Sequence, residues 1–328
     1  MLTDSLPRVS LAHLPTPLEE MPRLRQALGK GPRLLIKRDD QTGLATGGNK
    51  TRKLEFLVAE ALAQGADTLM TAGGPQSNHC RQTAAAAAKM GLRCVLVLGD
   101  GPQPRSGWNG NLLLDDLLGA DVRWTGDRDR DTVMAEVANE LAAAGAQPFV
   151  IPVGGSVPAG AAGYVAAVEE LAGQLAERGE QIDRIVFVSG SAGTHAGLLV
   201  GVKALGLDAR VEGIANDKVG DLRTKIRDLT GATTAHLGLD LSFSEEDFIL
   251  YEAYGTPGYG VITDAERAAI RLLARTEGIV IDPVYTGRAL VGLIDLVRQG
   301  VYSSDETVLF WHTGGTAGLF ARAAELLG

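Results

Sequence analysis

Short apolar runs alternate with longer segments of helical periodicity along most of the chain. Val, Ile and Leu dominate the short runs, which predict buried strands at 34–37, 68–71, 93–99, 148–152, 184–190, 211–215, 278–282 and 307–311. The intervening spacing predicts helices over 50–65, 81–91, 109–120 and 264–278, several of which end in a glycine suited to a helix C-cap. Continuous apolar strands separated by helices predict an α/β fold, with parallel sheets covered on both faces.

Composition and charge exclude several classes of function. The 328 residues are 45% hydrophobic and 22% charged, with a net charge of -9, which disfavours a nucleic-acid partner. The two cysteines and five histidines lack metal-ligand spacing, so we expect no metal site. The chain starts without a signal-peptide pattern, and no apolar run reaches the roughly 18 residues that span a bilayer. These features predict a cytoplasmic protein without a membrane partner.

Three glycine-rich loops follow predicted strands, at 71–84, 188–197 and 312–318. Ligands of open parallel sheets bind at the carboxyl ends of strands, so these loops indicate a site for an anionic ligand. The turn 190–193 precedes a helix whose free N–H groups suit a phosphate. Its spacing is not GxGxxG, which disfavours a dinucleotide. The alternative is that its glycines only permit tight packing of helix on sheet.

The second loop carries four consecutive polar residues, Gln76, Ser77, Asn78 and His79, at the start of a helix. Backbone N–H groups and polar side chains at such a position can bind a carboxylate. A Ser or Asn here also serves as an ordinary helix N-cap, which would explain one of the four. The GxSxG pattern of an esterase nucleophile is absent.

Lys50 lies in the stretch GGNK, which is one residue away from a nucleotide-binding P-loop. A P-loop follows a buried strand directly, whereas ten residues separate Lys37 from Gly48. The alternatives are a solvated surface charge, or a lysine that bonds a carbonyl carbon as a Schiff base. A Schiff-base lysine together with a separate phosphate loop is the pairing that pyridoxal phosphate requires.

The segments GGNKTRKLEFL, GGPQSNHCRQTAA, IPVGGS, SGSAGTHAGL, PGYG, IDPVYTGRALVGLI and HTGG occur in this order along nearly the whole chain. Together they resemble the family of D-cysteine desulfhydrases and 1-aminocyclopropane-1-carboxylate deaminases. The resemblance implies pyridoxal phosphate as cofactor, fold type II (tryptophan synthase β-like) with two open, mostly parallel twisted sheets flanked by helices, and a homodimer. It also implies a large cofactor domain, 1–51 plus 161–328, and a small domain, 52–160.

The resemblance also implies residue roles. The residues expected to bind the cofactor are Lys50, Lys53, Asn78, Ser191, Ala192, Gly193, Thr194, Thr286 and Thr313. Among them, Lys50 would bond the cofactor covalently and Asn78 would bind its ring oxygen. Lys53 and residues 191–194 would bind its phosphate. Substrate contacts fall to Gln76, Ser77, Asn78, His79, Tyr259 and Tyr285. The catalytic residues would be Lys50, Ser77, Tyr259 and Tyr285.

Two positions point to one activity within the family. Ring-opening deaminases carry Glu and Leu where this chain has Thr286 and Thr313. A glutamate beside the pyridine nitrogen would keep it protonated, whereas a hydroxyl favours the neutral ring. The resemblance therefore implies elimination from D-cysteine.

The alternative activities are those of an L-cysteate sulfo-lyase and of an eliminase of β-chloro-D-alanine or D-serine. The cyclopropane deaminase is a less favoured alternative. For Thr286, the alternative is that it only caps the following helix. For the whole protein, the alternative is a non-catalytic P-loop protein that binds a nucleotide. Residues 99–108 and 216–247 match the family poorly.

Overall fold

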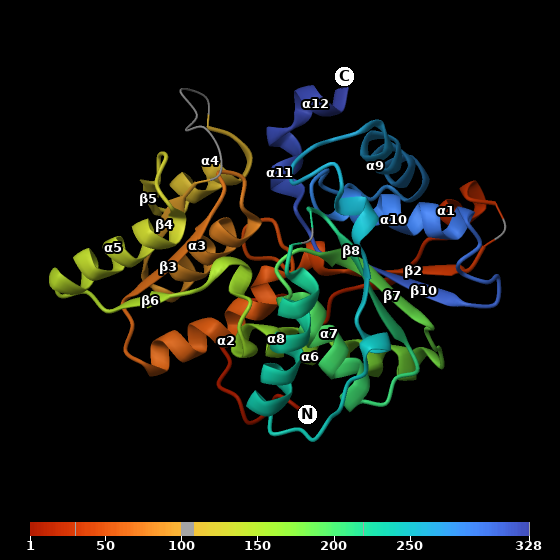
Figure 1. Cartoon of the computed structure of the whole chain (residues 1–328), viewed down its shortest axis with the longest axis horizontal. Coiled ribbons are helices and arrows are strands. Elements are labelled where there is room, and N and C mark those ends of the chain that lie inside the picture. Colours follow the sequence, from red (N-terminus) through yellow and green to blue (C-terminus); the bar gives the residue numbers. More distant parts are fainter. Residues whose placement is uncertain (30, 100–107, 219, 328) are drawn as a thin grey trace.

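The computed structural model describes residues 1–29, 31–99, 108–218 and 220–327, so most of the poorly matching stretch 99–108 lies outside it. Two separate sheets organise the chain (Figure 1). The large sheet has the order β1 (Leu18–Glu20), β2 (Arg33–Arg38), β10 (Thr307–His312), β7 (Arg184–Ser189), β8 (Arg210–Ala215) and β9 (Ile249–Tyr251). The small sheet has the order β5 (Asp121–Trp124), β4 (Arg93–Leu98), β3 (Thr68–Gly73) and β6 (Pro148–Val150). All pairings are parallel except that of β1 with β2.

Helices cover both faces of each sheet. They are α1 (Pro22–Ala27), α2 (Lys50–Ala63), α3 (Asn78–Met90), α4 (Gly110–Leu117), α5 (Arg130–Ala143), α6 (Pro158–Arg178), α7 (Gly193–Ala204), α8 (Leu222–His236), α9 (Asp264–Glu277), α10 (Thr286–Arg298), α11 (Thr316–Ala321) and α12 (Ala323–Leu327). Successive side chains of a strand point to opposite faces. Accordingly, Leu35 packs in the core beneath α6 and α7, whereas Leu34 and Ile36 pack beneath α9 and α10. The predicted α/β fold with two mostly parallel, doubly covered sheets is confirmed.

One predicted strand is wrong. Residues 278–282 form no strand, although Ile279 and Ile281 are buried against α9 and α10. Gly278 ends α9 in the left-handed conformation, and the apolar side chains after it fill the core as irregular chain. Three short strands, β1, β5 and β9, were not predicted, because each has only three or four residues and most of these are partly exposed.

A buried polar network anchors the first turn of α2 to the large sheet. Arg52 donates to Asp39, at 2.8 Å between Nη2 and Oδ1, and both side chains are almost fully buried. Asp39 also accepts hydrogen bonds from the Tyr164 hydroxyl of α6 at 2.7 Å and the Trp311 indole of β10 at 2.8 Å. These bonds tie α2, α6 and β10 together around one carboxylate, and they fix the helix that begins with Lys50.

No helix among the described residues is long and apolar enough to cross a membrane.

Candidate active site

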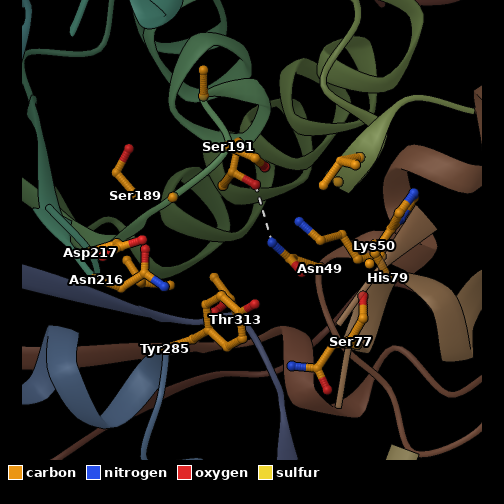
Figure 2. Close-up of a pocket in the computed structure, with 18 of the residues that line it drawn as sticks. Asn49, Lys50, Ser77, His79, Ser189, Ser191, Asn216, Asp217, Tyr285 and Thr313 are labelled. Carbon is orange, nitrogen blue, oxygen red and sulfur yellow. Dashed lines mark hydrogen bonds between the residues drawn. The ribbon is translucent and has the colours of Figure 1, made fainter. Parts of the chain in front are cut away.

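A cavity of about 430 Å³ lies between the two sheets. Its walls come from the carboxyl ends of strands: residues 73–74 and 77–79 after β3, 153–154 after β6, 188–192 at the end of β7, 216–217 after β8, and 313–314 after β10. Helix α2 adds Asn49 and Lys50 (Figure 2). The volume falls within the range of cofactor and small-molecule sites. The structure therefore brings the three glycine-rich loops together around a single cavity.

Lys50 is the first residue of α2, and a glycine pair with positive φ angles leads into it. Gly47 and Gly48 have φ values of 71° and 129°, and a side chain on Gly47 would lie 1.9 Å from the Asp40 carbonyl oxygen. The N–H of Gly48 donates to the Asp39 carbonyl at 2.9 Å, and that of Asn49 donates to the Thr313 carbonyl at 2.9 Å. A P-loop would direct such N–H groups at a phosphate. Here protein acceptors occupy them, which argues against nucleotide binding.

The Lys50 side chain is half-buried in the cavity wall, and burial lowers its pKa to about 8. A lysine with this pKa is partly neutral near neutral pH, and the neutral amine is the form that attacks carbonyl carbon. The interpretation of Lys50 as a solvated surface charge does not fit this position.

Lys53 lies one turn further along α2 and is fully buried. Burial and the charge of Lys50 hold its pKa well below the usual range, and its Nζ donates to the Gly154 carbonyl at 3.1 Å. Neither lysine has a carboxylate within ion-pair distance in the described part of the chain. Two neighbouring amines whose charged forms are disfavoured, and which have no anionic partner, make this corner a site for an anion, because an anion would stabilise their protonated forms.

The loop 190–193 stands over Lys53. A side chain on Gly193 would lie 2.6 Å from Lys53 Nζ, so only glycine lets the backbone approach this closely. Ala192 has a φ of 68°, and α7 begins directly after it. Ser191, Ala192 and Thr194 line the cavity, whereas Gly193 and Lys53 lie just behind the lining. Backbone N–H groups at a helix start beside buried cations suit a phosphate group, so the residues fit pyridoxal phosphate.

The four polar residues 76–79 after β3 lie in two different places. Ser77 is the N-cap of α3, with its Oγ accepting from the Cys80 N–H at 3.2 Å, and it also lines the cavity. Asn78 and His79 line the cavity as well. Gln76 is outside the lining, because its side chain donates to the Asn109 carbonyl at 3.1 Å and accepts from the Asn111 N–H at 2.9 Å. The structure therefore places Gln76 with the start of α4 and leaves the other three at the cavity.

Tyr259 and Tyr285 form a coupled pair in the cavity wall. Their hydroxyl oxygens are 2.7 Å apart, and their rings meet nearly edge to face at 5.9 Å between centroids. Burial and the neighbouring Tyr259 hold the pKa of Tyr285 well above its usual value. The Tyr259 N–H donates to Asp217 Oδ1 at 2.9 Å, which ties this chain segment to the end of β8. The pair can share a proton at one edge of the cavity.

Thr313 lines the cavity, whereas Thr286 is completely buried beside it. The Thr286 hydroxyl donates to the Gly314 carbonyl at 2.8 Å, so it supports the loop that follows Thr313. Helix α10 is capped by Asp282, which accepts hydrogen bonds from the N–H groups of Val284, Tyr285 and Thr286. Thr286 makes no side-chain capping bond, so the interpretation of this residue as a simple helix cap is wrong.

Several lining residues were not predicted from the sequence, namely Asn49, Ser189, His195, Asn216 and Asp217. Asn49 Nδ2 donates to Thr194 Oγ1 at 3.2 Å, which joins the lysine segment to the phosphate loop (Figure 2). Asn216 and Asp217 follow the carboxyl end of β8. The rule that selected the other loops would also have selected this one, although it contains a single glycine, Gly220, and no glycine pair.

Comparisons with known proteins agree with this geometry. The sequence profile of the family described as "Pyridoxal-phosphate dependent enzyme" matches residues 9–314. Proteins called D-cysteine desulfhydrase from Salmonella choleraesuis (strain SC-B67) and Salmonella newport (strain SL254) are each 46% identical over 321 residues, which cover 96% of this chain and 96% of each relative. A solved structure described as "Crystal Structure Analysis of the ACC deaminase homologue" is 40% identical, with a TM-score of 0.91 over 99% of this chain and 97% of the other.

Proposed function

Since this chain belongs to the family of pyridoxal-phosphate-dependent enzymes, we propose that it is a carbon–sulfur lyase that converts D-cysteine and water to pyruvate, hydrogen sulfide and ammonia. The observation that carries the cofactor site is the pairing of Lys50 and Lys53, two lysines without carboxylate partners among the described residues, beneath a helix N-terminus. The choice of substrate is supported by the 46% identity to D-cysteine desulfhydrases over nearly the full length.

When bound, pyridoxal phosphate supplies an aldehyde carbon that bonds amines and a ring that accepts the electrons left on the substrate Cα. Lys53 and the backbone of 191–194 would hold its phosphate, and Thr313, supported through Gly314 by Thr286, would lie at its ring. Lys50 would bond the cofactor and, once freed by the substrate amine, remove the proton from Cα as general base.

The substrate would be oriented by the other side of the cavity. Ser77, Asn78 and His79 line it at the start of α3, where backbone N–H groups and the helix dipole favour the substrate carboxylate. The hydroxyl pair of Tyr259 and Tyr285 would face the β-thiol and give the departing sulfur a proton. Expelling a thiolate requires less electron withdrawal by the cofactor ring than opening a carbon ring does. The hydroxyl side chain of Thr313 at the cavity, which Thr286 supports from behind, therefore suits the elimination better than the cyclopropane reaction.

The reaction is tested by incubating the purified protein with D-cysteine, L-cysteine, L-cysteate and 1-aminocyclopropane-1-carboxylate, and quantifying keto acid and sulfide. We expect D-cysteine to give both products. Lys50→Ala should lower kcat by at least about 10²-fold, because it removes the general base. Lys225→Ala, which removes an exposed lysine of α8, should keep wild-type activity. Keto acid from L-cysteate but not from D-cysteine would replace the proposed substrate, and full sulfide production by Lys50→Ala would refute the role of Lys50.

We also propose that 1–51 with 161–328 forms the large domain and 52–160 the small one, and that the chain works as a cytoplasmic homodimer. The two separate sheets support the division, because the small sheet uses only residues 68–150. The family resemblance supports the dimer. Sedimentation velocity of the pure protein tests the dimer, limited proteolysis in the loops that flank α2 and α6 tests the boundaries, and fractionation of the source cells tests the location.

A further inference from the structure

The amide group of Asn78 has only one orientation that its neighbours permit. Its Oδ1 accepts hydrogen bonds from Arg81 Nη1 and from Asn111 Nδ2, both at 3.1 Å. A guanidinium has donors only, so the atom of Asn78 that faces Arg81 must be the oxygen. Asn111 is oriented in the same way, because its own Oδ1 accepts from Arg81 Nη1 at 2.8 Å. Arg81 therefore sets the direction of both amides.

This arrangement leaves the amide nitrogen of Asn78 for the cavity. Asn78 lines the cavity, and its Nδ2 donates to no acceptor within the described ranges of the chain. An amide N–H at a cavity wall binds an oxygen of a ligand, and binds an anionic oxygen most strongly. Asn111 is held in turn by the Gln76 segment, since its Nδ2 also donates to the Gln76 carbonyl at 2.9 Å. The polar chain thus runs from α4 through Asn111 to the cavity.

Arg81 itself is a buried cation with neutral partners. Its side chain is fully buried, and its third bond is from Nη2 to the Gly47 carbonyl at 2.8 Å. No carboxylate lies within ion-pair distance of it among the residues the structure describes. Burial lowers the pKa of Arg81 to about 10, so it stays protonated at neutral pH. Asp115 and Asp282 oppose this charge only from beyond ion-pair distance, so Arg81 still favours a negative ligand atom in the nearby cavity.

We infer that Arg81 and Asn111 are positioning residues that turn the Asn78 amide nitrogen toward the cavity, where it donates to the anionic oxygen on the cofactor ring. Arg81 adds a positive charge that favours the ionised form of this oxygen. It also connects Asn78 with Gly47, and so holds the start of α3 against the loop that leads to Lys50. This inference rests on the proposed function, and it gives a role to Arg81 and Asn111, which lie behind the residues that line the cavity.

The test compares the affinities of the full-length protein for pyridoxal phosphate and for its 3-O-methyl ether, which cannot carry the negative charge. Wild-type protein should prefer pyridoxal phosphate by about tenfold, as a charge-assisted hydrogen bond implies. Arg81→Met and Asn111→Asp should both lose most of this preference. Asn111→Asp is isosteric, so it keeps the packing, but it cannot donate to Asn78 and it neutralises Arg81.

Arg184→Met is the matched control, since it also removes a largely buried arginine, but at the amino end of β7, where the arginine pairs with Glu212. It should keep the wild-type preference. A folded Asn111→Asp protein, shown by an unchanged circular dichroism spectrum, that still prefers pyridoxal phosphate by the wild-type ratio would overturn the inference. Failure of the wild-type protein to bind pyridoxal phosphate would instead overturn the proposed function, so the two failures are distinguishable.

A second readout does not depend on the ether. The visible absorbance of the cofactor-loaded protein should titrate with its midpoint about one pH unit higher in Arg81→Met than in wild type, because removing a positive charge disfavours the anionic oxygen. Arg81→Lys keeps the charge but loses the fork of donors, so it should retain the midpoint and lose affinity. A wild-type midpoint in Arg81→Met would show that the charge of Arg81 does not reach the cofactor.

Discussion

Lys50 is a cation that three features of its surroundings disfavour. It is half-buried, it starts a helix whose dipole repels positive charge, and Lys53 lies one turn away. Arg52, between them, escapes the same penalty because Asp39 pairs with it. The difference between these neighbours shows that the protein neutralises the cation that anchors the helix and leaves the two cations at the site for a ligand.

The lowered pKa of Lys50, about 8, predicts how the cofactor-free protein takes up pyridoxal phosphate. Only the neutral amine attacks the aldehyde, and lowering the pKa brings the neutral form into a lower pH range. The rate constant of covalent uptake should rise about tenfold between about pH 7 and about pH 9 and then level off. Stopped-flow absorbance measures it, with Lys50→Ala as the control that gives no covalent phase. A rate that still climbs steeply above about pH 10 would indicate an ordinary lysine.

Residues of the site could be predicted where the sequence marks them with glycine. Lys50, Ser77 and Thr313 each lie within a few residues of a glycine pair, and the structure places all three at the cavity. Gln76 stands beside Ser77 in sequence, yet its side chain turns to α4, because Gln76 lies in the turn before the N-cap of α3 and not in the helix. Asn216 and Asp217 carry no local signal, and only their position after β8 brings them to the site.

At the scale of elements, an arginine of α10 holds one side of a segment that carries a predicted catalytic residue. Arg288 of α10 donates from Nη1 to the Tyr254 carbonyl at 2.6 Å and from Nη2 to the Val261 carbonyl at 2.7 Å. These two carbonyls flank Tyr259. Arg288 also forms a buried ion pair with Glu266 of α9. The same helix starts next to Tyr285, so Arg288 fixes the two tyrosines relative to each other.

We therefore predict that Arg288→Lys lowers kcat/KM for D-cysteine by about 10- to 100-fold, although the lysine keeps a positive charge beside Glu266. A lysine cannot bond both carbonyls with the geometry of a guanidinium, so the segment around Tyr259 loses its fixed position. If Arg288 acts through Tyr259, the effects of Arg288→Lys and Tyr259→Phe should be less than additive in the double variant. Full additivity would assign Arg288 to another role.

Elements were predicted well where they are long and central, and poorly where they are short and at an edge. Strand β3 has six buried residues between two parallel neighbours, and its pattern alone identified it. Strand β9 has three residues on the edge of the large sheet, where a solvated side weakens the pattern. The apolar run 278–282 misled the prediction, because periodicity reports burial and does not report whether a strand partner is within reach.

At the scale of the whole molecule, the cavity lies between the two sheets and is lined by loops of both. Its walls include loops after strands of the small sheet and loops after strands of the large one, so a cofactor bound there would contact both. A ligand that binds only the folded state stabilises it by about 2.7 kcal/mol at one hundred times its Kd. Pyridoxal phosphate at this concentration should raise the Tm by about 4 °C for a chain of this size.

Differential scanning calorimetry measures this shift, with pyridoxal at the same concentration as the control. Pyridoxal lacks the phosphate that Lys53 and the 191–194 loop would hold, so it should raise the Tm by much less. Equal shifts from the two compounds would argue against a phosphate site at this loop.

The central position of β10 sets an order of events during synthesis. This strand follows all other described strands in the sequence, yet it pairs with β2 on one side and β7 on the other. Until residues 307–312 leave the ribosome, the large sheet exists only as two unconnected parts, and the carbonyl of Thr313 that receives the Asn49 N–H is missing. The small sheet, completed by residue 150, can form much earlier. The cofactor therefore meets a finished site only after residues up to Thr313 have been synthesised, and a ribosome that stalls before β10 leaves a chain that folds in part and lacks the complete site.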